Sequence, residues 1–478
     1  MQVTQYENTG FIIFERGDRV LDDTIAAVGT APGEAGIGIV RISGNKSQEI
    51  LGQIFKGKKA KDINEMPSRY MSYGFIYDDE GKKIDEVLAV IMRAPYSYTG
   101  EDVVEIHCHG GMISIRKIMD LVLKKGARMA EAGEFTKRGF LNGRIDLAQS
   151  EAVIDIITAK TDEGLENAMN QLQGELSLKV KNVMDILLSM LAHIEAAVDF
   201  PEHDIEEVTE ENLKNQAMEA MGILKELQDT YYEGKIHREG LSTAIIGRPN
   251  VGKSSLLNLL LKENRAIVTD IPGTTRDIIE EYLNIKGVLI KLIDTAGLRE
   301  TEDIVEKIGV ERTKEALNKA DLVIYMVDAS KELTSEDTAI ASMIKDKKVI
   351  IAANKVDKGI EADLDMLADT FETDNVIKMS VKDKIGIDLL EKAIYDIAYS
   401  GNIRSKSSAV VSNIRHKSLI DKAYESIEKA LEAIDEGIPV DLISVDIKDA
   451  WSFLGQITGD TVEEDIINEI FSRFCIGK

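Results

Sequence analysis

Residues 247–254 carry the residue types that a phosphate-binding loop needs. They read GRPNVGKS, which matches the pattern G-x-x-x-x-G-K-[ST]. Glycines allow backbone N–H groups to surround a phosphate, and the following helix adds its positive N-terminus. In this pattern Lys253 reaches the outer phosphates, and the hydroxyl of Ser254 is a ligand for Mg²⁺. A chance glycine-rich turn is the alternative interpretation, and the motifs that follow in order disfavour it.

The elements that must position this loop are short apolar strands. Leu241–Ile246, directly before the loop, predicts a buried strand, and Val288–Ile293 predicts a second one. The second strand leads into the sequence DTAG, in which the aspartate can hold Mg²⁺ through water and the glycine N–H can contact a γ-phosphate. Its residues are Asp294, Thr295, Ala296 and Gly297. Thr274 and Thr275 lie between the two motifs, where the first switch of a nucleotide hydrolase is expected.

The identity of the base is predicted from the end of another strand, Val349–Ala353. The sequence after it is N-K-x-D, formed by Asn354, Lys355 and, two residues on, Asp357. A carboxylate at the last position accepts hydrogen bonds from the N1–H and the 2-amino group of guanine. Adenine lacks this pair of donors, so the motif predicts GTP as the nucleotide.

Two further strands complete the predicted nucleotide-binding sheet. Ser380 and Lys382 follow the strand Val376–Met379 and resemble the loop that backs the guanine base. The strand Asp321–Val327 shows no ligand-like residue at its end. Motifs that follow in this order within one domain are far more specific than a single glycine-rich loop.

Composition restricts the classes of protein to which the chain can belong. The 478 residues include two cysteines, which exclude a disulfide framework and favour a reducing cytoplasm. The N-terminus lacks the apolar core of a signal peptide, and no run of about 18 apolar residues predicts a membrane span. The net charge of −26 repels phosphate backbones, so any nucleic acid must bind a local basic patch or a partner protein. The basic stretch FKGKKAKD, from Phe55, is interpreted as a solvated loop.

The region from Asp23 to about Leu141 predicts an α+β domain. Strands are expected at Ile25–Val28, Ile37–Ile42, Tyr70–Tyr77, Glu86–Met92 and Val103–Ile106, and helices at Ser47–Phe55 and Gly111–Lys125. Arg41 lies inside an apolar strand, where a structural ion pair is the usual role and a ligand contact the alternative. The sequence His107-Cys108-His109 invites a metal-site interpretation, which is rejected because no second ligand cluster accompanies it.

Helical periodicity dominates two segments on either side of the nucleotide-binding motifs. Apolar residues recur every three or four positions from 151 to 199, which predicts one long helix that Pro201 ends. A second helix is expected from Thr209 to Tyr232, with Thr209 as its N-cap. Helical spacing resumes at Asn413–Ile434, Ile447–Leu454 and Thr461–Phe474. The nucleotide-binding domain is therefore predicted to be inserted into a helical domain.

Longer motifs relate nearly the whole chain, from Asp23 to Lys478, to a known family. They are VRISG at 40–44, YTGEDVVEIHCHGG at 98–111, AGEFTKRGFLNGRIDLAQSEAV at 132–153, and the sequences GRPNVGKSSLLN, PGTTRD, DTAGLRE and terminal FCIGK. With them the chain resembles the MnmE (TrmE) family of bacterial tRNA-modification GTPases. The segment before Asp22 has no counterpart in the family and is assigned no role.

The resemblance implies an α/β multidomain protein. Residues 1–141 would form an α+β domain that binds a tetrahydrofolate derivative and makes a constitutive homodimer. Residues 142–235 and 401–478, which end in FCIGK, would form one all-α helical domain, and residues 236–400 an inserted Ras-like P-loop GTPase domain.

The resemblance also implies the activity and its partners. With the FAD-dependent protein MnmG (GidA), in a heterotetramer or larger complex, the family adds an aminomethyl-type group, such as carboxymethylaminomethyl, to C5 of the wobble uridine of certain tRNAs. The one-carbon unit would come from 5-formyl-tetrahydrofolate or another tetrahydrofolate derivative. Positions matching the folate site are Arg41, Glu105, Arg144 and Lys478, and Arg144 stands where some members have lysine. Cys475 would act as a catalytic residue near the terminus.

GTP hydrolysis needs a residue to orient the attacking water. Leu298 follows the DTAG motif and cannot do so, which leaves Glu300, Glu302, Asp303 and Glu306 as acidic possibilities. The resemblance points to Glu306. It also implies K⁺ rather than an arginine finger, for which Arg276 and Arg299 are the alternatives. The metal positions implied are Asn250, Thr269, Ile271 and Thr274 for K⁺, and Ser254 and Thr275 for Mg²⁺. The remaining nucleotide contacts expected are Val251, Gly252, Ser255, Asp270, Pro272 and Gly273.

Two other classes of function stay open at this point. One is a regulatory GTPase, for example in ribosome assembly, that performs no one-carbon chemistry. The other is a folate-binding module with a structural GTPase domain appended. The terminal cysteine argues against the first alternative, and a water-orienting Glu306 argues against the second, since a structural domain needs no such acid.

Overall fold

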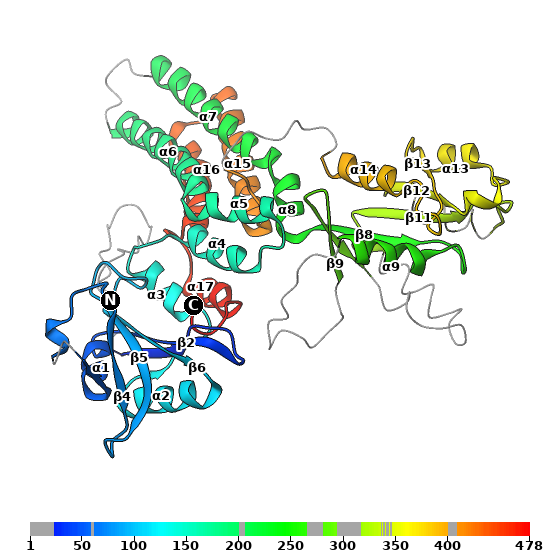
Figure 1. Ribbon diagram of the computed structural model, residues 1–478. Helices are drawn as coiled ribbons and strands as arrows, with labels where there is room; N and C mark the ends of the chain where they lie inside the picture. The colour runs from blue at the N-terminus through cyan, green and yellow to red at the C-terminus, as the bar shows by residue number, and fades with distance from the viewer. Residues whose placement is uncertain are drawn as a thin grey trace. The chain divides into compact units, whose positions relative to one another are not determined.

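The computed structural model describes residues 23–58, 62–199, 206–264, 281–293, 317–335, 337, 340, 344, 347–399 and 409–478. The chain divides into two compact units. The first comprises Met1–Ile154, Gln171–Leu224 and Leu419–Lys478, and the second comprises Asp155–Asn170 and Lys225–Ser418. Figure 1 shows the order of the elements along the chain. The described part of the chain contains no helix long and apolar enough to cross a membrane.

A seven-stranded sheet forms the N-terminal part of the first unit, in the order β3-β4-β5-β6-β2-β1-β7. The strands are β1 (Ile25–Val28), β2 (Ala35–Ser43), β3 (Phe55–Gly57), β4 (Ser72–Tyr77), β5 (Lys83–Met92), β6 (Val103–Gly110) and β7 (Arg128–Met129). Neighbours are antiparallel except for β1 and β7, which run parallel. This arrangement confirms the predicted α+β character, although the two- and three-residue strands β7 and β3 are too short for a periodicity to reveal.

Helices cover one face of this sheet. Helices α1 (Ser47–Ile54) and α2 (Met112–Lys124) bury their apolar sides against residues such as Val40, Ile42 and Ile106. A short 3₁₀ helix, Ile63–Glu65, and α3 (Glu134–Leu141) complete this region. Because side chains alternate along a strand, the neighbours Arg41 and Glu105 point to the opposite face. That opposite face holds the polar residues considered below.

The helical part of the chain comes from both sides of the nucleotide-binding segment. Its helices are α4 (Leu147–Thr158), α5 (Asp162–Leu172), α6 (Glu175–Asp199), α7 (Glu206–Asp229), α8 (Tyr231–Glu239), α15 (Ile414–Asp435), α16 (Val440–Thr458) and α17 (Glu464–Ser472). Within the first unit, α6 packs along α16, which lies some 250 residues later in the sequence. Figure 1 shows these two helices, one green and one orange-red, side by side.

The prediction of one continuous helix from 151 to 199 is wrong. The structure divides this stretch into α4, α5 and α6. The hydroxyl of Thr161 accepts a hydrogen bond from the N–H of Gly164 at 3.1 Å, so it caps a new helix start. The amide of Gln149 donates to the carbonyl of Leu172 at 2.9 Å and satisfies the end of α5. The apolar stripe continues through both breaks, which is why periodicity alone did not reveal them. The helix predicted from Thr209 to Tyr232 likewise begins earlier, at Glu206, and ends at Asp229 before α8.

The second unit contains a six-stranded sheet in the order β13-β12-β11-β8-β10-β9. Its strands are β8 (Leu241–Ile246), β9 (Glu281–Ile285), β10 (Val288–Leu292), β11 (Leu322–Asp328), β12 (Lys348–Asn354) and β13 (Val376–Lys378), and its helices are α9 (Lys253–Asn264), α13 (Leu364–Phe371) and α14 (Ile387–Ala398), with a 3₁₀ turn at Val356–Lys358. All strands run parallel except β9, an antiparallel edge. Separate apolar cores lie on the two faces of the sheet. The sheet is therefore of the doubly wound type, which agrees with the inserted Ras-like α/β domain that the resemblance implied, and β9 is an added antiparallel strand.

Candidate functional site

The phosphate-binding loop lies where the strand order of the second sheet reverses. Strand β8 has β10 on one side and β11 on the other, and the loop connects the carboxyl end of β8 to α9. Ligands of open α/β sheets bind at such a switch point, beyond the carboxyl ends of the strands. The N-terminus of α9 also directs its backbone N–H groups to this place. The fold thus places GRPNVGKS where a nucleotide phosphate would bind.

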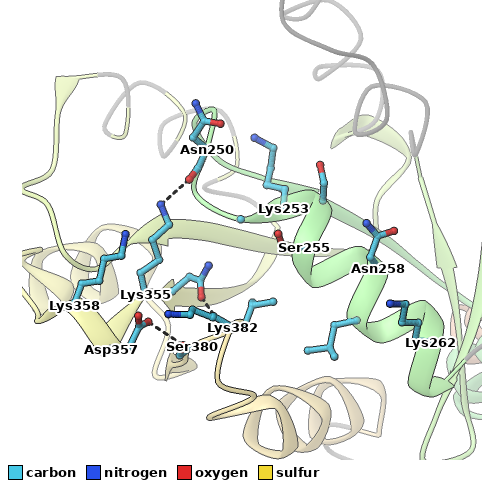
Figure 2. Close-up of a pocket in the computed structure, with 15 residues that line it drawn as sticks. Asn250, Lys253, Ser255, Asn258, Lys262, Lys355, Asp357, Lys358, Ser380 and Lys382 are labelled. Atoms are coloured by element: carbon cyan, nitrogen blue, oxygen red, sulfur yellow. Dashed lines mark hydrogen bonds between the residues drawn. The ribbon is translucent and has the colours of Figure 1, made fainter.

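A pocket of about 670 Å³ extends from this loop to the predicted base-recognition motif (Figure 2). Its lining joins three segments that are far apart in the sequence. They are the loop and α9 (Asn250, Gly252, Lys253, Ser254, Ser255, Asn258, Leu259 and Lys262), the end of β12 (Asn354, Lys355, Asp357 and Lys358) and the loop after β13 (Ser380, Val381 and Lys382). The structure therefore brings together most of the described residues that the sequence assigned to the phosphates and to the base. Val251, a predicted contact, does not line the pocket; its side chain is 3 % exposed and packs in the apolar core.

The loop is closely packed against the base-recognition motif. The amide of Asn354 donates to the carbonyl of Val251 at 2.7 Å and accepts from the N–H of Val381 at 3.0 Å. Gly252 has φ +111°, and a Cβ there would lie 2.4 Å from the Asn354 amide nitrogen. Only glycine fits this conformation and this contact. Asn354 is 3 % exposed, so its role is to hold the two loops in register.

Lys253 and Asn250 occupy the parts of the loop nearest the pocket. The ammonium of Lys253 donates to the carbonyls of Gly247 and Arg248 at 2.7 and 2.8 Å, and burial lowers its pKa. Asn250 has the left-handed φ of +62°, which asparagine tolerates better than most residues. Its backbone carbonyl accepts a hydrogen bond from Lys355 at 2.7 Å. Figure 2 shows Lys253 and Asn250 on the same loop, with Lys355 reaching toward Asn250.

Asp328 contacts the base-recognition motif, and the sequence analysis assigned it no role. It ends β11, is 5 % exposed, and accepts a hydrogen bond from the ammonium of Lys355 at 2.7 Å. Although burial acts in the opposite direction, hydrogen bonds from Lys355 and Ser330 lower the pKa of Asp328. The carboxylate therefore stays charged at neutral pH, and this ion pair is lost only as the pH falls through that lowered value. The available signal was an acidic residue directly after an apolar strand.

We expect Asp328→Asn to weaken GTP binding by about ten- to a hundredfold, because a charge-assisted hydrogen bond that positions Lys355 contributes about 1.5–3 kcal/mol. Titration with a fluorescent GTP analogue measures the change. Asp321→Asn is the matched control, since Asp321 lies just before the opposite end of β11 and pairs with Lys235. Equal affinities for the two variants would contradict the assigned role.

The carboxylate expected to read guanine is held by the following loop. The hydroxyl of Ser380 donates to Asp357 at 2.9 Å, and it accepts from the N–H of Asp383 at 3.2 Å. Lys382 lines the same pocket. Asp357 thus lines the same pocket as the phosphate loop, as the binding of a guanine nucleotide requires.

Several predicted site residues lie outside the residues that the structure describes. They are Thr269, Asp270, Ile271, Pro272, Gly273, Thr274, Thr275, Asp294, Thr295, Ala296, Gly297 and Glu306. The described part of the pocket therefore carries the phosphate loop and the base-recognition residues.

A second cluster of predicted residues meets on the polar face of the N-terminal sheet. Arg41 on β2 lies opposite Glu105 on β6, and its Nε donates to Glu105 Oε1 at 2.8 Å. The guanidinium carbon lies 5.4 Å from the ring centroid of Tyr98 and 5.7 Å from that of Phe135. Arg41 therefore forms a structural ion pair with Glu105 and also lines a polar site that contains aromatic rings.

The C-terminus reaches this cluster. Residues Ala132 and Ile476 form an antiparallel bridge, and the N–H of Gly133 donates to the carbonyl of Cys475 at 3.4 Å. Gly477 has φ +96°, and a Cβ there would lie 2.4 Å from the carbonyl of Val28. Its own carbonyl accepts from Arg41 at 3.3 Å. Hundreds of residues separate Gly477 from β1 and β2, yet backbone contacts hold the tail against both.

Charged side chains surround Lys478, the last residue. Burial, followed by the positive charge of Arg41, lowers the pKa of Lys478, while Glu105 and Cys475 act in the opposite direction. Of the two free cysteines, Cys475 is partly exposed and Cys108 is buried. Arg41, Glu105, Cys475 and Lys478 are thus neighbours, although nothing in their spacing along the chain indicates it.

Arg144 lies at the edge of this cluster. It donates to the backbone carbonyl of Tyr98 at 2.7 Å, and its guanidinium carbon lies 4.8 Å from the centroid of the same ring. Tyr98 therefore has arginines near it from two different segments, β2 and the turn after α3. This arrangement suits a flat, polar ligand with carboxylate groups.

The apolar side chains of the terminal tail differ in their burial. Phe471 and Phe474 are buried against Phe140 and Leu147. Ile476 is 60 % exposed. It alternates with Cys475 along an extended backbone that is bridged to Ala132, so its side chain points away from the core.

The three residues His107, Cys108 and His109 have different surroundings. His107 lies 3.3 Å from Glu105, while Nδ1 of His109 lies 2.6 Å from Asp85. Burial, with the charge of Asp85, raises the pKa of Cys108 to about 11. Among the described residues no group of three or more His, Cys, Asp or Glu side chains is placed to hold a metal ion.

Comparison with known proteins places this architecture in a family. Residues 24–144 match the family model described as the GTP-binding protein TrmE N-terminus, and residues 147–475 match the MnmE helical domain. The chain is 55 % identical to the tRNA modification GTPase MnmE of Alkaliphilus metalliredigens, over 96 % of this chain and 100 % of the relative. It is 53 % identical to the protein of the same name from Clostridioides difficile, again over 96 % and 100 %.

Solved structures align with only part of the chain. Era of Aquifex aeolicus, bound to GDP and AlF₄⁻, is 28 % identical over 38 % of this chain and 65 % of its own, with a TM-score of 0.26. The G domain of the Thermotoga maritima FeoB iron transporter is 26 % identical over 33 % of this chain and 97 % of its own, with a TM-score of 0.25. The full-length relatives and the two family models carry the assignment: this chain belongs to the MnmE (TrmE) family of tRNA modification GTPases.

Proposed function

We propose that this chain is a K⁺-dependent GTPase that works with an FAD-dependent MnmG (GidA) partner to modify tRNA in the cytoplasm. It adds an aminomethyl-type group to C5 of the wobble uridine, using a tetrahydrofolate-derived one-carbon unit. Membership of the family supplies GTP binding, GTP hydrolysis and tRNA modification. The observation that carries the rest of the proposal is the terminal segment, whose Cys475 and Lys478 meet Arg41 and Glu105 in a chain that also holds a GTP pocket.

The GTP pocket supplies binding and orientation. Lys253 and the N-terminus of α9 face the phosphates, and Asp357 accepts from the guanine edge. Ser254 at the start of α9, with Thr275, is the hydroxyl pair we assign to Mg²⁺. Asn250, with backbone oxygens near Thr269, Ile271 and Thr274, is assigned to K⁺, since a hard cation prefers oxygen ligands. Glu306 would orient the attacking water.

We expect GTP hydrolysis to be faster in KCl than in NaCl at equal ionic strength. A cation that stabilises charge between the phosphates in the transition state contributes about 10²-fold, the scale of one preorganised electrostatic group. Asn250→Ala should remove most of this stimulation. Asn250→Gly is a second variant that keeps the left-handed backbone of Asn250 and removes only the side chain. Equal turnover in the two salts would contradict the K⁺ assignment.

The second site has the donors and acceptors that a tetrahydrofolate derivative needs. Arg41, Arg144 and Lys478 provide positive charge for the glutamate carboxylates. Glu105 accepts hydrogen bonds, and the rings of Tyr98 and Phe135 offer flat surfaces for a pterin. The folate derivative, when bound, supplies the one-carbon unit. We assign to Cys475 the role of a nucleophile or of an acid or base in this chemistry, and its partial exposure supports the assignment.

The domain organisation we propose follows the same division of labour. Residues 1–141 bind the folate derivative and form the homodimer, residues 236–400 hydrolyse GTP, and the helical segments 142–235 and 401–478 join them. The partner flavoprotein would complete a heterotetramer or larger complex with tRNA.

Reconstitution tests this proposal. Purified protein is combined with an MnmG protein, FAD, NADH, GTP, K⁺, an amine donor, a tetrahydrofolate derivative and unmodified tRNA, and wobble nucleosides are analysed by mass spectrometry. We expect the modified uridine only in the complete mixture. Hydrolysis of GTP without any nucleoside change, under conditions where a known family member succeeds, would favour a regulatory GTPase instead.

A further inference from the structure

Part of the polar face of the N-terminal sheet is open. Phe135 of α3 and the terminal tail lie over the β1–β2 side of this face. At the other side, on β4 and β5, Tyr73 is 37 % exposed and Leu88 is 39 % exposed. The helices α1 and α2 pack on the reverse face and do not cover these residues. The uncovered area therefore presents large side chains to solvent.

Aromatic rings line this area in a regular order. Tyr73, Phe75 and Tyr77 alternate along β4, so their side chains share one face of the sheet. The ring centroids of Tyr73 and Phe75 are 5.7 Å apart. Tyr73, Phe75 and Tyr77 do not belong to the apolar core under the helices, whereas Ile76, on the opposite face of β4, does.

A lysine accompanies each of these rings. The ammonium of Lys58 lies 5.5 Å from the centroid of Tyr73, that of Lys83 lies 4.2 Å from Phe75, and that of Lys56 lies 4.6 Å from Tyr77. These distances are typical of cation–π contacts. The lysines come from β5, from β3 and from the residue that follows β3. We name these six residues, Lys56, Lys58, Tyr73, Phe75, Tyr77 and Lys83, the aromatic–lysine face.

This combination has a specific chemical meaning in a chain with a net charge of −26. Most of such a surface repels a polyanion, so a cluster of lysines marks the place where one can approach. Aromatic rings stack on unpaired bases, and lysines neutralise the phosphates between them. A lysine stem is flexible enough to move its ammonium to a phosphate while the ring receives a base. A paired duplex would offer its phosphates but not its base faces.

We propose that the aromatic–lysine face binds the unpaired tRNA loop that carries the wobble uridine. The proposal rests on the proposed function, which requires that loop to reach the site of Cys475. Across the sheet, Tyr73 pairs with Leu88, Leu88 with His107, and His107 with Ile39. This row spans three strand spacings, about 14 Å, and ends two residue pairs from Arg41 and Glu105. The face thus begins a continuous path along the sheet to the second site.

The face also contains a group that opposes RNA. Glu86 on β5 lies opposite Phe75 on the neighbouring strand β4, and Glu86 is exposed. A phosphate bound beside Phe75 would be repelled by it. We therefore expect Glu86→Gln to bind RNA more tightly than the parent protein, which a packing role for the lysines would not produce.

Binding to a stem–loop RNA with uridine at the wobble position tests the proposal. The full-length protein and its variants are titrated with this labelled RNA and, as a control, with a fully paired duplex of equal length. We expect Tyr73→Ala to weaken stem–loop binding about tenfold or more, since one stacked base contributes on this scale. Tyr73→Phe keeps the aromatic ring and should bind the stem–loop as tightly as the parent protein. Replacing Lys56, Lys58 and Lys83 together by alanine should lower the slope of log K against log salt by about two, at roughly 0.7 per phosphate contact. Lys117 is an exposed lysine on α2, behind the sheet, and Lys117→Ala should change neither the stem–loop affinity nor its salt dependence.

The alternative occupants of this face give different results. Unchanged stem–loop affinity in both Tyr73→Ala and the triple lysine variant would overturn the proposal. So would equal losses for the loop and the duplex, because stacking would then have no part. Dissociation of a dimer in the variants, measured by analytical ultracentrifugation, together with unchanged RNA affinity, would make the face an interface between copies. The rate of GTP hydrolysis should be unchanged in every variant. If the parent protein modifies tRNA normally while these tests fail, the proposed function stands and only the RNA surface is wrong.

Discussion

Replacing Glu306 with alanine is expected to lower kcat for GTP hydrolysis by about 10²–10⁴-fold, the range of a general-base contribution. The affinity for GTP should stay nearly unchanged, because a residue that orients water acts only in the transition state. The motivation is the sequence DTAGL, in which Leu298 occupies the position of the usual water-orienting glutamine. Single-turnover hydrolysis and equilibrium binding, measured separately, give the two quantities.

Variants of the neighbouring acids provide the control for this experiment. Glu302→Ala removes a carboxylate four residues earlier in the same segment and should leave hydrolysis intact. If Glu302→Ala abolishes hydrolysis while Glu306→Ala has no effect, the assignment chose the wrong acid. A loss of GTP affinity in Glu306→Ala would indicate a structural role instead.

Deleting residues 475–478 is expected to abolish tRNA modification while leaving folding and basal GTP hydrolysis intact. The deletion removes the bridge to Ala132 and the contact of Gly477 with Arg41. It keeps Phe471 and Phe474, which carry the apolar anchoring of the tail. Thermal melting, phosphate release and wobble-nucleoside analysis measure the three properties. Full modification by the truncated protein would reduce the tail to a packing element.

Single substitutions separate the roles within this tail. Cys475→Ser should lose nearly as much modification as the deletion, because a hydroxyl is a far weaker nucleophile than a thiolate. Lys478→Ala should mainly weaken binding of 5-formyl-tetrahydrofolate, which a folate titration detects. Ile476→Ala is the matched control, since the exposed Ile476 side chain contributes little to the core. Equal losses in all three variants would indicate that the tail acts only through its backbone.

Much of the nucleotide-binding fold followed from the sequence because its signals are local. Leu241–Ile246 is a short, mainly apolar run that is followed by a glycine, and the strand has those bounds in the structure. The motif residues follow strand ends, and parallel strands deliver their carboxyl ends to one edge of a sheet. Lys253 and Asp357 therefore had to lie near one pocket once their strands were identified.

Other features depend on contacts that no local pattern contains. The division between α4 and α5 rests on a cap from Thr161 within an unbroken apolar stripe. The role of Asp328 depends on where the side chain of Lys355 turns, not on the strand that Asp328 ends. Strand β9 buries only a few residues at a sheet edge, so its periodicity is weak.

The second site shows this difference most clearly. Arg41 and Glu105 pair only because β2 and β6 are neighbours, and Lys478 joins them from the far end of the chain. Resemblance to the family, rather than spacing, indicated that these positions belong together. The structure adds the backbone contacts of Gly133 and Gly477 that hold the tail there.

The central claim is that one chain couples GTP hydrolysis to modification of the wobble uridine through its terminal cysteine. The most direct measurement is mass spectrometry of wobble nucleosides from a deletion strain. The strain is complemented with the gene for the parent protein, for Cys475→Ser or for Glu306→Ala. We predict the modified uridine with the parent gene and its loss, or near loss, with each variant. Unchanged nucleosides in cells that lack the protein altogether would contradict the account.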